Sequence, residues 1–230
     1  MKKVDTFLFD LDGTVLDSNK LIIDAFKYVF KTKFPELILT EKEYLSFIGP
    51  TLWASFSKYE PDRKKVDELV LLYREYSDLY YDDLKAFKGA EELFKTLKEK
   101  GYKIGIVSSK MHHLVVRALE VTNLLEYVDV VVGSEDVKRH KPHPEGLLLA
   151  AKTLKSKKSL YVGDHPSDVK AGKKANMLTC GVSYSYHKDI IKEEPDFMID
   201  GLLDLLEEKF YVWCGSYWCW SCGDYSGNLR

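Results

Sequence analysis

FLFDLDGT at residues 7–14 is the stretch that decides the fold. Its apolar run is typical of a buried strand, which ends on Asp10 and Asp12 and then breaks at Gly13. Carboxylates this close repel each other, and a divalent cation is the usual remedy. Asp10 can then attack as a nucleophile while Asp12 moves a proton. The stretch therefore predicts phosphoryl transfer through an aspartyl-phosphate.

The composition excludes several classes of protein. The chain has 230 residues and a formal net charge of -2, which gives no basic footprint for nucleic acid. Its apolar runs have the length of strands, and its first residues do not resemble a secretory signal. We expect a cytoplasmic protein without a membrane span, a monomer or homodimer, whose partner is a small phosphorylated substrate.

After Phe87, strands alternate with helices, which favours βαβ units in a mostly parallel sheet. The strands are continuous apolar runs, as expected when helices cover both faces of a sheet. Strands are expected at 4–9, 102–108, 127–132, 159–163, 178–183 and 197–199, and a last helix at 201–209. The predicted fold class is α/β, a Rossmann-like parallel core with an α-helical cap domain inserted after the first strand.

The segment between Thr14 and Ala86 has no strong strand signal, and its apolar residues recur at helical spacing. Thr40 and Glu43 have the spacing of a capping box at the start of a short helix. The predicted domains are a core at 1–16 and 86–210, a helical cap at 17–85 and an atypical tail at 211–230.

The tail is rich in tryptophan and cysteine. Cys214, Cys219 and Cys222 have a spacing that suits zinc if a fourth ligand is supplied, but no partner pair is evident. We expect an appended tail rather than a metal site.

Ligands of open α/β sheets bind outside the carboxyl ends of the strands. The polar residues at the predicted strand ends are Asp10, Asp12, Ser108, Ser109, Lys110, Lys141, Asp164 and Asp168. Each motif alone could be purely structural, since Asp, Gly and Ser are common in turns and caps. Their order at four successive strand ends favours one shared site.

Catalytic roles follow from the residue types. Asp10 is the expected nucleophile, and Asp12 is the general acid and then the general base. Ser108 and Lys141 are expected to bind the non-bridging oxygens of the phosphoryl group, where Lys141 offsets charge that shifts during transfer.

Mg²⁺ is the expected cofactor, because it prefers oxygen ligands. Asp10 and Asp164 are the predicted side-chain ligands, and Asp12 is predicted to contribute its backbone carbonyl. Asp168 lies one helical turn beyond Asp164, so we expect it to act through water. His165 is next to Asp164, but no catalytic role is expected for it.

These residues resemble the four motifs of the haloacid dehalogenase superfamily, in that family's order and over roughly residues 3–209. The helical insert resembles its C1-type cap. Within the superfamily the chain is similar to phosphoglycolate phosphatases and bacterial pyrophosphatases. The resemblance implies Mg²⁺-dependent phosphatase activity and a cap that closes over the substrate. Asp12 departs from the dehalogenases, and Ile22 and Gly49 depart from the sugar-phosphate mutases.

Selectivity is expected to come from the cap. The predicted substrate-binding residues are Gly13, Ser109, Gly49, Pro50 and Arg74. Lys20 and Lys58 are further candidate cations for a second anionic group, although single charges are more often solvated surface groups.

The sequence thus predicts a phosphoric monoester hydrolase that resembles phosphoglycolate phosphatase. Inorganic pyrophosphatase is the alternative, and a phosphotransferase or sugar-phosphate mutase is less favoured. A non-catalytic binding module with the same fold is disfavoured by the complete set of strand-end residues.

Overall fold

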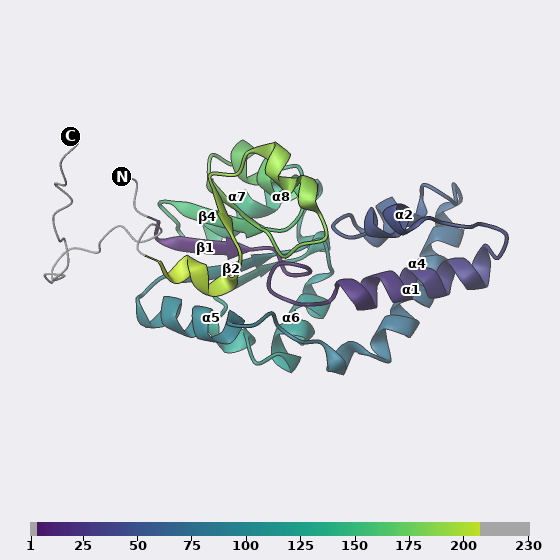
Figure 1. Ribbon diagram of the computed structural model, residues 1–230, viewed down its shortest axis with the longest axis horizontal. Coiled ribbons are helices and arrows are strands. Elements are labelled where there is room, and N and C mark those ends of the chain that lie inside the picture. The colour runs from purple at the N-terminus through teal and green to yellow at the C-terminus, as the bar shows by residue number, and fades with distance from the viewer. Residues whose placement is uncertain (1–3, 208–230) are drawn as a thin grey trace, which may run out of the picture.

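The computed structural model describes residues 4–207 as a parallel α/β core joined to a helical insert (Figure 1). The strands form one six-stranded sheet in the order β3-β2-β1-β4-β5-β6, with every neighbouring pair parallel. They are β1 Thr6–Phe9, β2 Lys103–Val107, β3 Val130–Val132, β4 Ser159–Gly163, β5 Leu178–Val182 and β6 Phe197–Ile199. The α/β fold class is confirmed.

Strand β1 lies at the centre of the sheet and is completely buried. Thr6 pairs with Lys103 of β2 on one side and with Ser159 of β4 on the other. Phe7 and Phe9 join the hydrophobic cluster on one face of the sheet, and Leu8 joins the cluster on the opposite face. The alternation of a strand explains this division, and it places Asp10 between the ends of β2 and β4.

Helices cover both faces of the sheet (Figure 1). Helices α5 Ala90–Glu99 and α6 His112–Val121 pack on the face of Phe7 and Phe9. Helices α7 Glu145–Thr153 and α8 Pro166–Lys174 pack on the face of Leu8.

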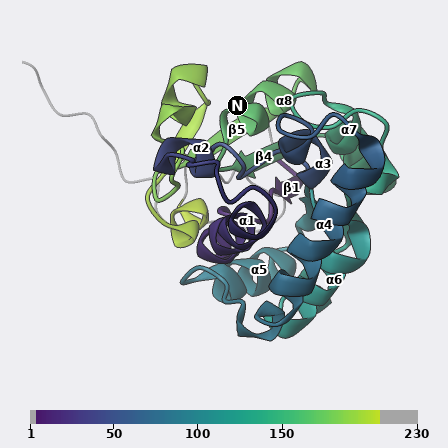
Figure 2. The same cartoon turned by 90° about the vertical axis from the view of Figure 1, so that its right-hand side faces the viewer.

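Figure 2 shows the helices of the insert, labelled α1 to α4, in front of the core. They pack around an aromatic cluster that is separate from the clusters of the core. They are α1 Asn19–Lys33, α2 Glu41–Leu45, α3 Leu52–Phe56 and α4 Arg63–Asp78. At the cluster's centre the ring of Phe26 lies 4.5 Å from that of Phe47 and 5.0 Å from that of Phe56. The predicted capping box is confirmed, since Thr40 and Glu43 exchange side-chain-to-backbone hydrogen bonds at the start of α2.

The two crossings between insert and core lie side by side. Leu16 and Ala86 form an isolated antiparallel bridge, and the amide of Asp17 donates to the Lys85 carbonyl at 2.9 Å. Arg117 of α6 forms ion pairs with Asp78 and Asp82 near the second crossing. These contacts fix where the insert leaves the sheet.

Short 3₁₀ helices complete the described chain: η1 Tyr81–Asp83, η2 Leu125–Tyr127, η3 Ser134–Asp136, η4 Lys188–Glu193 and η5 Leu202–Leu206. Two of them correct the sequence prediction. The strand expected at 127–132 starts only at Val130, because η2 takes Tyr127. The helix expected at 201–209 is 3₁₀ over its described part, which puts Leu202 and Leu205 on one buried side.

The cysteine-rich tail at 211–230 lies outside the described residues. Among residues 4–207, no helix combines the length and the apolar character that a bilayer crossing requires.

Candidate active site

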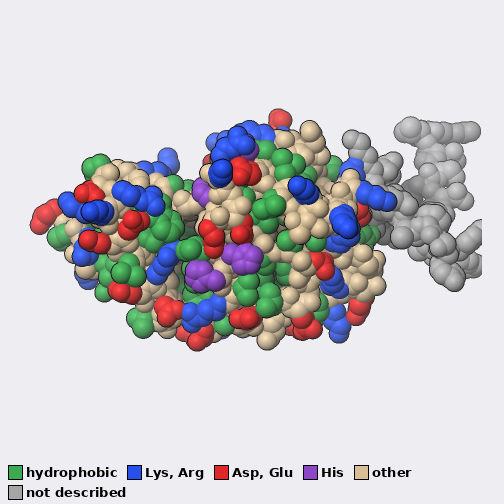
Figure 3. All heavy atoms as spheres, turned by 180° about the vertical axis from the view of Figure 1, so that it is seen from behind, with side chains coloured by type: hydrophobic (Ala, Val, Ile, Leu, Met, Phe, Trp, Pro, Cys, Tyr) green, Lys and Arg blue, Asp and Glu red, His purple; other side chains and the backbone are tan. Residues whose placement is uncertain are grey.

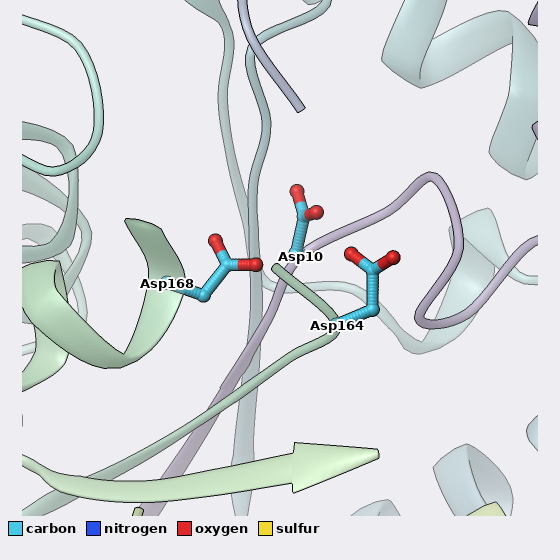
Figure 4. A group of neighbouring side chains, drawn as sticks. All are labelled: Asp10, Asp164 and Asp168. Carbon is cyan, nitrogen blue, oxygen red and sulfur yellow. The ribbon is translucent and has the colours of Figure 1, made fainter. Parts of the chain in front are cut away.

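Three carboxylates from different parts of the sequence converge at the carboxyl end of the sheet (Figure 4). Asp10 follows β1, Asp164 follows β4, and Asp168 lies in the first turn of α8. One oxygen from each carboxylate lies within 4.8 Å of the others, and all three residues are buried. The sheet therefore brings together the acidic groups that the sequence placed at its strand ends.

One ammonium group faces these carboxylates. Lys141 Nζ lies 2.7 Å from Asp10 Oδ1 and 2.8 Å from Asp168 Oδ1. Lys141 also donates to the Tyr161 hydroxyl at 3.2 Å, and this hydroxyl donates to Asp168 Oδ1 at 3.0 Å. When all three carboxyl groups are ionised, the single positive charge of Lys141 leaves the cluster with an excess of negative charge.

The surroundings shift the pKa values of the three carboxyl groups in different directions. Burial raises the pKa of Asp10 to about 7, although the Lys141 charge opposes this shift. Burial and the charge of Asp10 also raise the pKa of Asp164 well above its usual range. Burial alone would raise the pKa of Asp168, but Lys141 and the hydrogen bond from the His165 amide lower it. Asp10 and Asp164 are therefore the two carboxyl groups whose ionised form a bound cation would stabilise most.

Two neighbours of Asp164 fix its position. The Ser185 hydroxyl hydrogen-bonds to Asp164 Oδ2 at 3.0 Å. Gly13, at φ +81°, passes so close that a Cβ placed on it would lie 2.4 Å from the same oxygen. The Gly13 amide donates to the Leu16 carbonyl at 2.9 Å, and Gly13 is not among the residues that line the cleft described below. The close approach and the hydrogen bond place Gly13 in the turn that carries Asp12, and its contact with substrate stays a prediction.

Asp12 lies apart from the three-carboxylate cluster and has its own partners. Its Oδ1 atom lies 2.9 Å from Lys110 Nζ and 2.5 Å from the Ser18 hydroxyl. The Lys110 ammonium lies 5.4 Å from the centre of the Tyr81 ring. The two carboxylates of the opening motif are therefore each paired with a different lysine.

A cleft of about 380 Å³ lies between the strand ends and the insert. Of the candidate residues, it is lined by Asp10, Asp12, Ser108, Ser109, Gly49, Pro50 and Arg74. Lys141 and the two aspartates after β4 are not among the lining residues. The nucleophile candidate therefore has the cleft on one side and the buried charge cluster on the other.

The three candidate cations of the insert are placed differently. Arg74 lines the cleft, where its guanidinium lies 5.0 Å from the Trp53 ring centre and 2.6 Å from Met111 Sδ. Lys20 is exposed and pairs with Asp24 at 2.5 Å, and Lys58 is also exposed. Neither of these lysines lines the cleft, so Arg74 is the candidate that the structure favours.

The insert touches the core close to this site. Gly49 has φ +104°, and a Cβ on it would lie 3.1 Å from the His165 ring. The His165 ring packs edge-on against that of His187 at 4.4 Å, and burial lowers the pKa of His165 to about 4. The face seen in Figure 3 also carries histidine side chains on the core beside the insert. The His165 ring is therefore neutral at neutral pH, and it packs between Gly49 of the insert and His187 of the core.

Three residues that support the site were not assigned a role from the sequence. Tyr161 follows from no sequence signal, because it lies within an apolar strand. Ser185 lies in a loop beyond β5, outside the strand-end motifs. Lys110 was noted at a strand end, but only the fold shows that its partner is Asp12.

The amino-acid sequence is similar to those of known hydrolases. A family model described as haloacid dehalogenase-like hydrolase matches residues 7–182. The chain is 39% identical over 209 residues to pyrophosphatase PpaX from Listeria monocytogenes, covering 89% of this chain and 95% of that protein.

Solved structures are similar as well. A haloacid dehalogenase-like hydrolase from Bacteroides fragilis has a TM-score of 0.81 and 30% identity, over 88% of this chain and 100% of the other. A predicted phosphoglycolate phosphatase from Haemophilus somnus has a TM-score of 0.75 over 90% of this chain and 98% of the other; at 22% identity it supports the fold alone. The family match and the 39% identical relative together show that this chain belongs to the haloacid dehalogenase-like hydrolases.

Proposed function

We propose that the protein is a Mg²⁺-dependent phosphatase that hydrolyses small phosphorylated metabolites, as phosphoglycolate phosphatase does. The observation that carries this proposal is the position of Asp10. Asp10 lines the cleft, and on its buried side it pairs with Lys141 and lies beside the carboxylates of Asp164 and Asp168. A nucleophile fixed in this way meets a phosphoryl group with little reorganisation.

The proposed reaction has two steps. A carboxylate oxygen of Asp10 attacks phosphorus, the bond to the leaving oxygen breaks, and Asp12 gives that oxygen a proton. Asp12 then takes a proton from water, which attacks the aspartyl-phosphate and releases inorganic phosphate. Ser108, the Ser109 amide and Lys141 are proposed to bind the non-bridging oxygens.

The residues around Asp10 fit a magnesium ion. Three buried carboxylates share one ammonium, so a divalent cation would balance their charge, and hard oxygen ligands suit Mg²⁺. We propose the carboxylates of Asp10 and Asp164 and the main-chain carbonyl of Asp12 as ligands. Asp168 already has Lys141, Tyr161 and the His165 amide as partners, which supports a role through water. When bound, the ion supplies positive charge for the phosphoryl oxygens.

We propose that residues 17–85 act as a cap over the core formed by 1–16 and 86–210. The separate aromatic cluster of the insert and the paired crossings at Leu16 and Ala86 support this division. Gly49, Pro50 and Arg74 are the cap residues that face the substrate in the proposal.

The direct test is the variant Asp10→Asn, assayed on p-nitrophenyl phosphate with Mg²⁺. Loss of the nucleophile should lower kcat by roughly a thousand-fold or more. Asp17→Asn is the matched control, because Asp17 is exposed in the same loop. Substantial turnover by a folded Asp10→Asn protein would refute the assignment, and removal of Mg²⁺ by a chelator should stop the wild type reversibly.

Inorganic pyrophosphatase is a second candidate, favoured by the 39% identity to a protein named pyrophosphatase PpaX. A panel with phosphoglycolate and pyrophosphate, with and without Mg²⁺, separates the two. Phosphoryl transfer to an added alcohol, instead of release of inorganic phosphate, would identify a phosphotransferase.

A further inference from the structure

Each of the two proposed catalytic carboxylates pairs with a different lysine. Lys141 pairs with Asp10, the proposed nucleophile, and Lys110 pairs with Asp12, the proposed acid. The Lys110 side chain is 17% exposed and lines the cleft. The Tyr81 ring next to it is held by a hydrogen bond from its hydroxyl to the Leu114 carbonyl. The ammonium of Lys110 is therefore held in the cleft beside Asp12, the proposed acid.

Arg74 adds a second cation to the same wall. Arg63, Arg117 and Arg139 all form ion pairs with carboxylates, whereas Arg74 forms none with the described residues. Its Nε atom is buried without a hydrogen-bond partner, and its Nη2 atom meets the Met111 thioether, which is a weak acceptor. Met111 directly follows Lys110, so both cations border the same part of the cleft.

Arg74 is the cleft-lining cation that has no carboxylate partner among residues 4–207. Of the acidic residues that line the cleft, Asp12, Asp10 and Asp78 pair with Lys110, Lys141 and Arg117, and Glu75 forms no ion pair with the described residues. Glu135 favours the charged form of Arg74 but forms no ion pair with it among the described residues, and its carboxylate accepts from the His112 amide. The Arg74 guanidinium is partly buried over the Trp53 ring, and its Nε atom has no hydrogen-bond partner, so an anionic ligand in the cleft would supply the acceptor and the negative charge that it lacks.

We propose that Lys110 and Arg74 form a subsite for a negatively charged leaving group. The preferred substrates then carry a second phosphate or a carboxylate close to the transferred phosphoryl group, and neutral leaving groups bind less well. This inference rests on the proposed function, because it places the leaving oxygen next to Asp12. A simpler role for Lys110, holding Asp12 in position, would affect all substrates equally.

Binding separates these roles without turnover. Calorimetry in Mg²⁺ should show that methylenediphosphonate binds the wild type at least about ten-fold more tightly than methylphosphonate. Lys110→Met and Arg74→Met should each remove most of this preference while methylphosphonate binding changes little. Lys95→Met is the control, since Lys95 is exposed on α5 and outside the cleft. Equal weakening of both ligands by both variants, or no preference in the wild type, would overturn the subsite.

Kinetics supply the second readout. Phosphoglycolate and 2-hydroxyethyl phosphate differ in whether the leaving group carries a carboxylate, so the ratio of their kcat/KM values measures the subsite. Lys110→Met should lower this ratio about ten-fold or more, and Lys110→Arg should restore part of it. Thermal melting checks that each variant is folded, and Arg74→Met tests the subsite separately should Lys110→Met not fold.

The two proposals fail in different ways. If the wild type hydrolyses neither ester but prefers the diphosphonate, the proposed function fails and the anion subsite stands. If it hydrolyses both esters with equal kcat/KM, the proposed function stands and the subsite is refuted.

Discussion

Gly13 shows how one backbone position constrains the active site. It adopts φ +81°, and a Cβ there would lie 2.4 Å from Asp164 Oδ2. Gly101 has a similar φ of +78° but has no atom within 4 Å of its Cβ position. Both glycines have the positive φ that disfavours other residues, but only Gly13 has a neighbouring side chain where a Cβ would lie.

We predict that Gly13→Ala lowers both stability and Mg²⁺-dependent activity, because the methyl group displaces the Asp164 carboxylate. Gly101→Ala should cost about 1 kcal/mol of unfolding free energy, from backbone strain alone, and leave activity unchanged. Denaturant unfolding and assays on p-nitrophenyl phosphate measure both effects. Equal activity of the two variants would contradict this role of Gly13.

Tyr161 connects the buried ammonium to the carboxylate cluster, so its hydroxyl has a measurable role. We predict that Tyr161→Phe lowers kcat roughly ten-fold, because a hydrogen bond to a charged group contributes about 1.5–3 kcal/mol. Tyr186→Phe is the control, since Tyr186 is 52% exposed. If kcat stays at the wild-type value, Tyr161 does not help to orient Lys141 and Asp168.

The sequence indicated that Asp10, Asp164 and Lys141 would lie close together, as they do, but it did not indicate the side chains that support them. The end of β1 predicts Asp10, because an ordinary surface turn does not require two acidic residues and Gly13 directly after a buried apolar run. Tyr161 carries no such mark, since its aromatic ring is ordinary in a strand and only its hydroxyl takes part. Ser185 and Lys110 depend on which loops meet in space, and tertiary packing alone decides that.

At the scale of elements, local signals were reliable where they had a specific cause. The Thr40 capping box and β4 at 159–163 follow from side-chain chemistry and from a clear apolar run. The errors arose at η2 and η5, where Tyr127 and the leucines of 202–206 suit several structures. Short apolar segments do not distinguish a strand from a tight helical turn.

The N-terminus of α4 offers a test at this scale. Asp62 accepts hydrogen bonds from the amides of Lys64 at 2.8 Å and Lys65 at 3.4 Å. We predict that Asp62→Ala lowers the unfolding free energy by about 1 kcal/mol through loss of this cap. Glu68→Ala, an exposed change on the same helix, should cost less. Equal losses in denaturant unfolding would show that the cap contributes nothing.

Over the whole molecule, the carboxylate cluster links stability to pH and to Mg²⁺. The pKa of Asp10 rises from 3.8 to about 7, so the metal-free native state retains a proton that the unfolded chain releases. The stability that this proton gives the metal-free folded state is fully present below about pH 4 and is lost as the pH rises through about 7. Mg²⁺ binds the deprotonated carboxylates, so it should restore stability at the alkaline end.

We therefore predict that the rise in Tm caused by Mg²⁺ grows from about pH 5 to about pH 8. Thermal melts with chelator and with excess Mg²⁺ across this range measure it. Asp10→Asn removes one titrating group and should flatten the dependence. A shift in Tm that does not vary with pH would show that the cluster does not bind the ion through these carboxylates.

The place of β1 in the sheet also determines the order of assembly during synthesis. This strand is synthesised before the other five described strands, so Thr6 has its backbone paired on both sides only after Lys103 and then Ser159 have been made. The four helices of 19–78 can meanwhile pack around their own aromatic rings. The nascent chain thus holds an apolar, incompletely paired strand until β4 has been synthesised, and this is the interval in which aggregation or chaperone capture would occur.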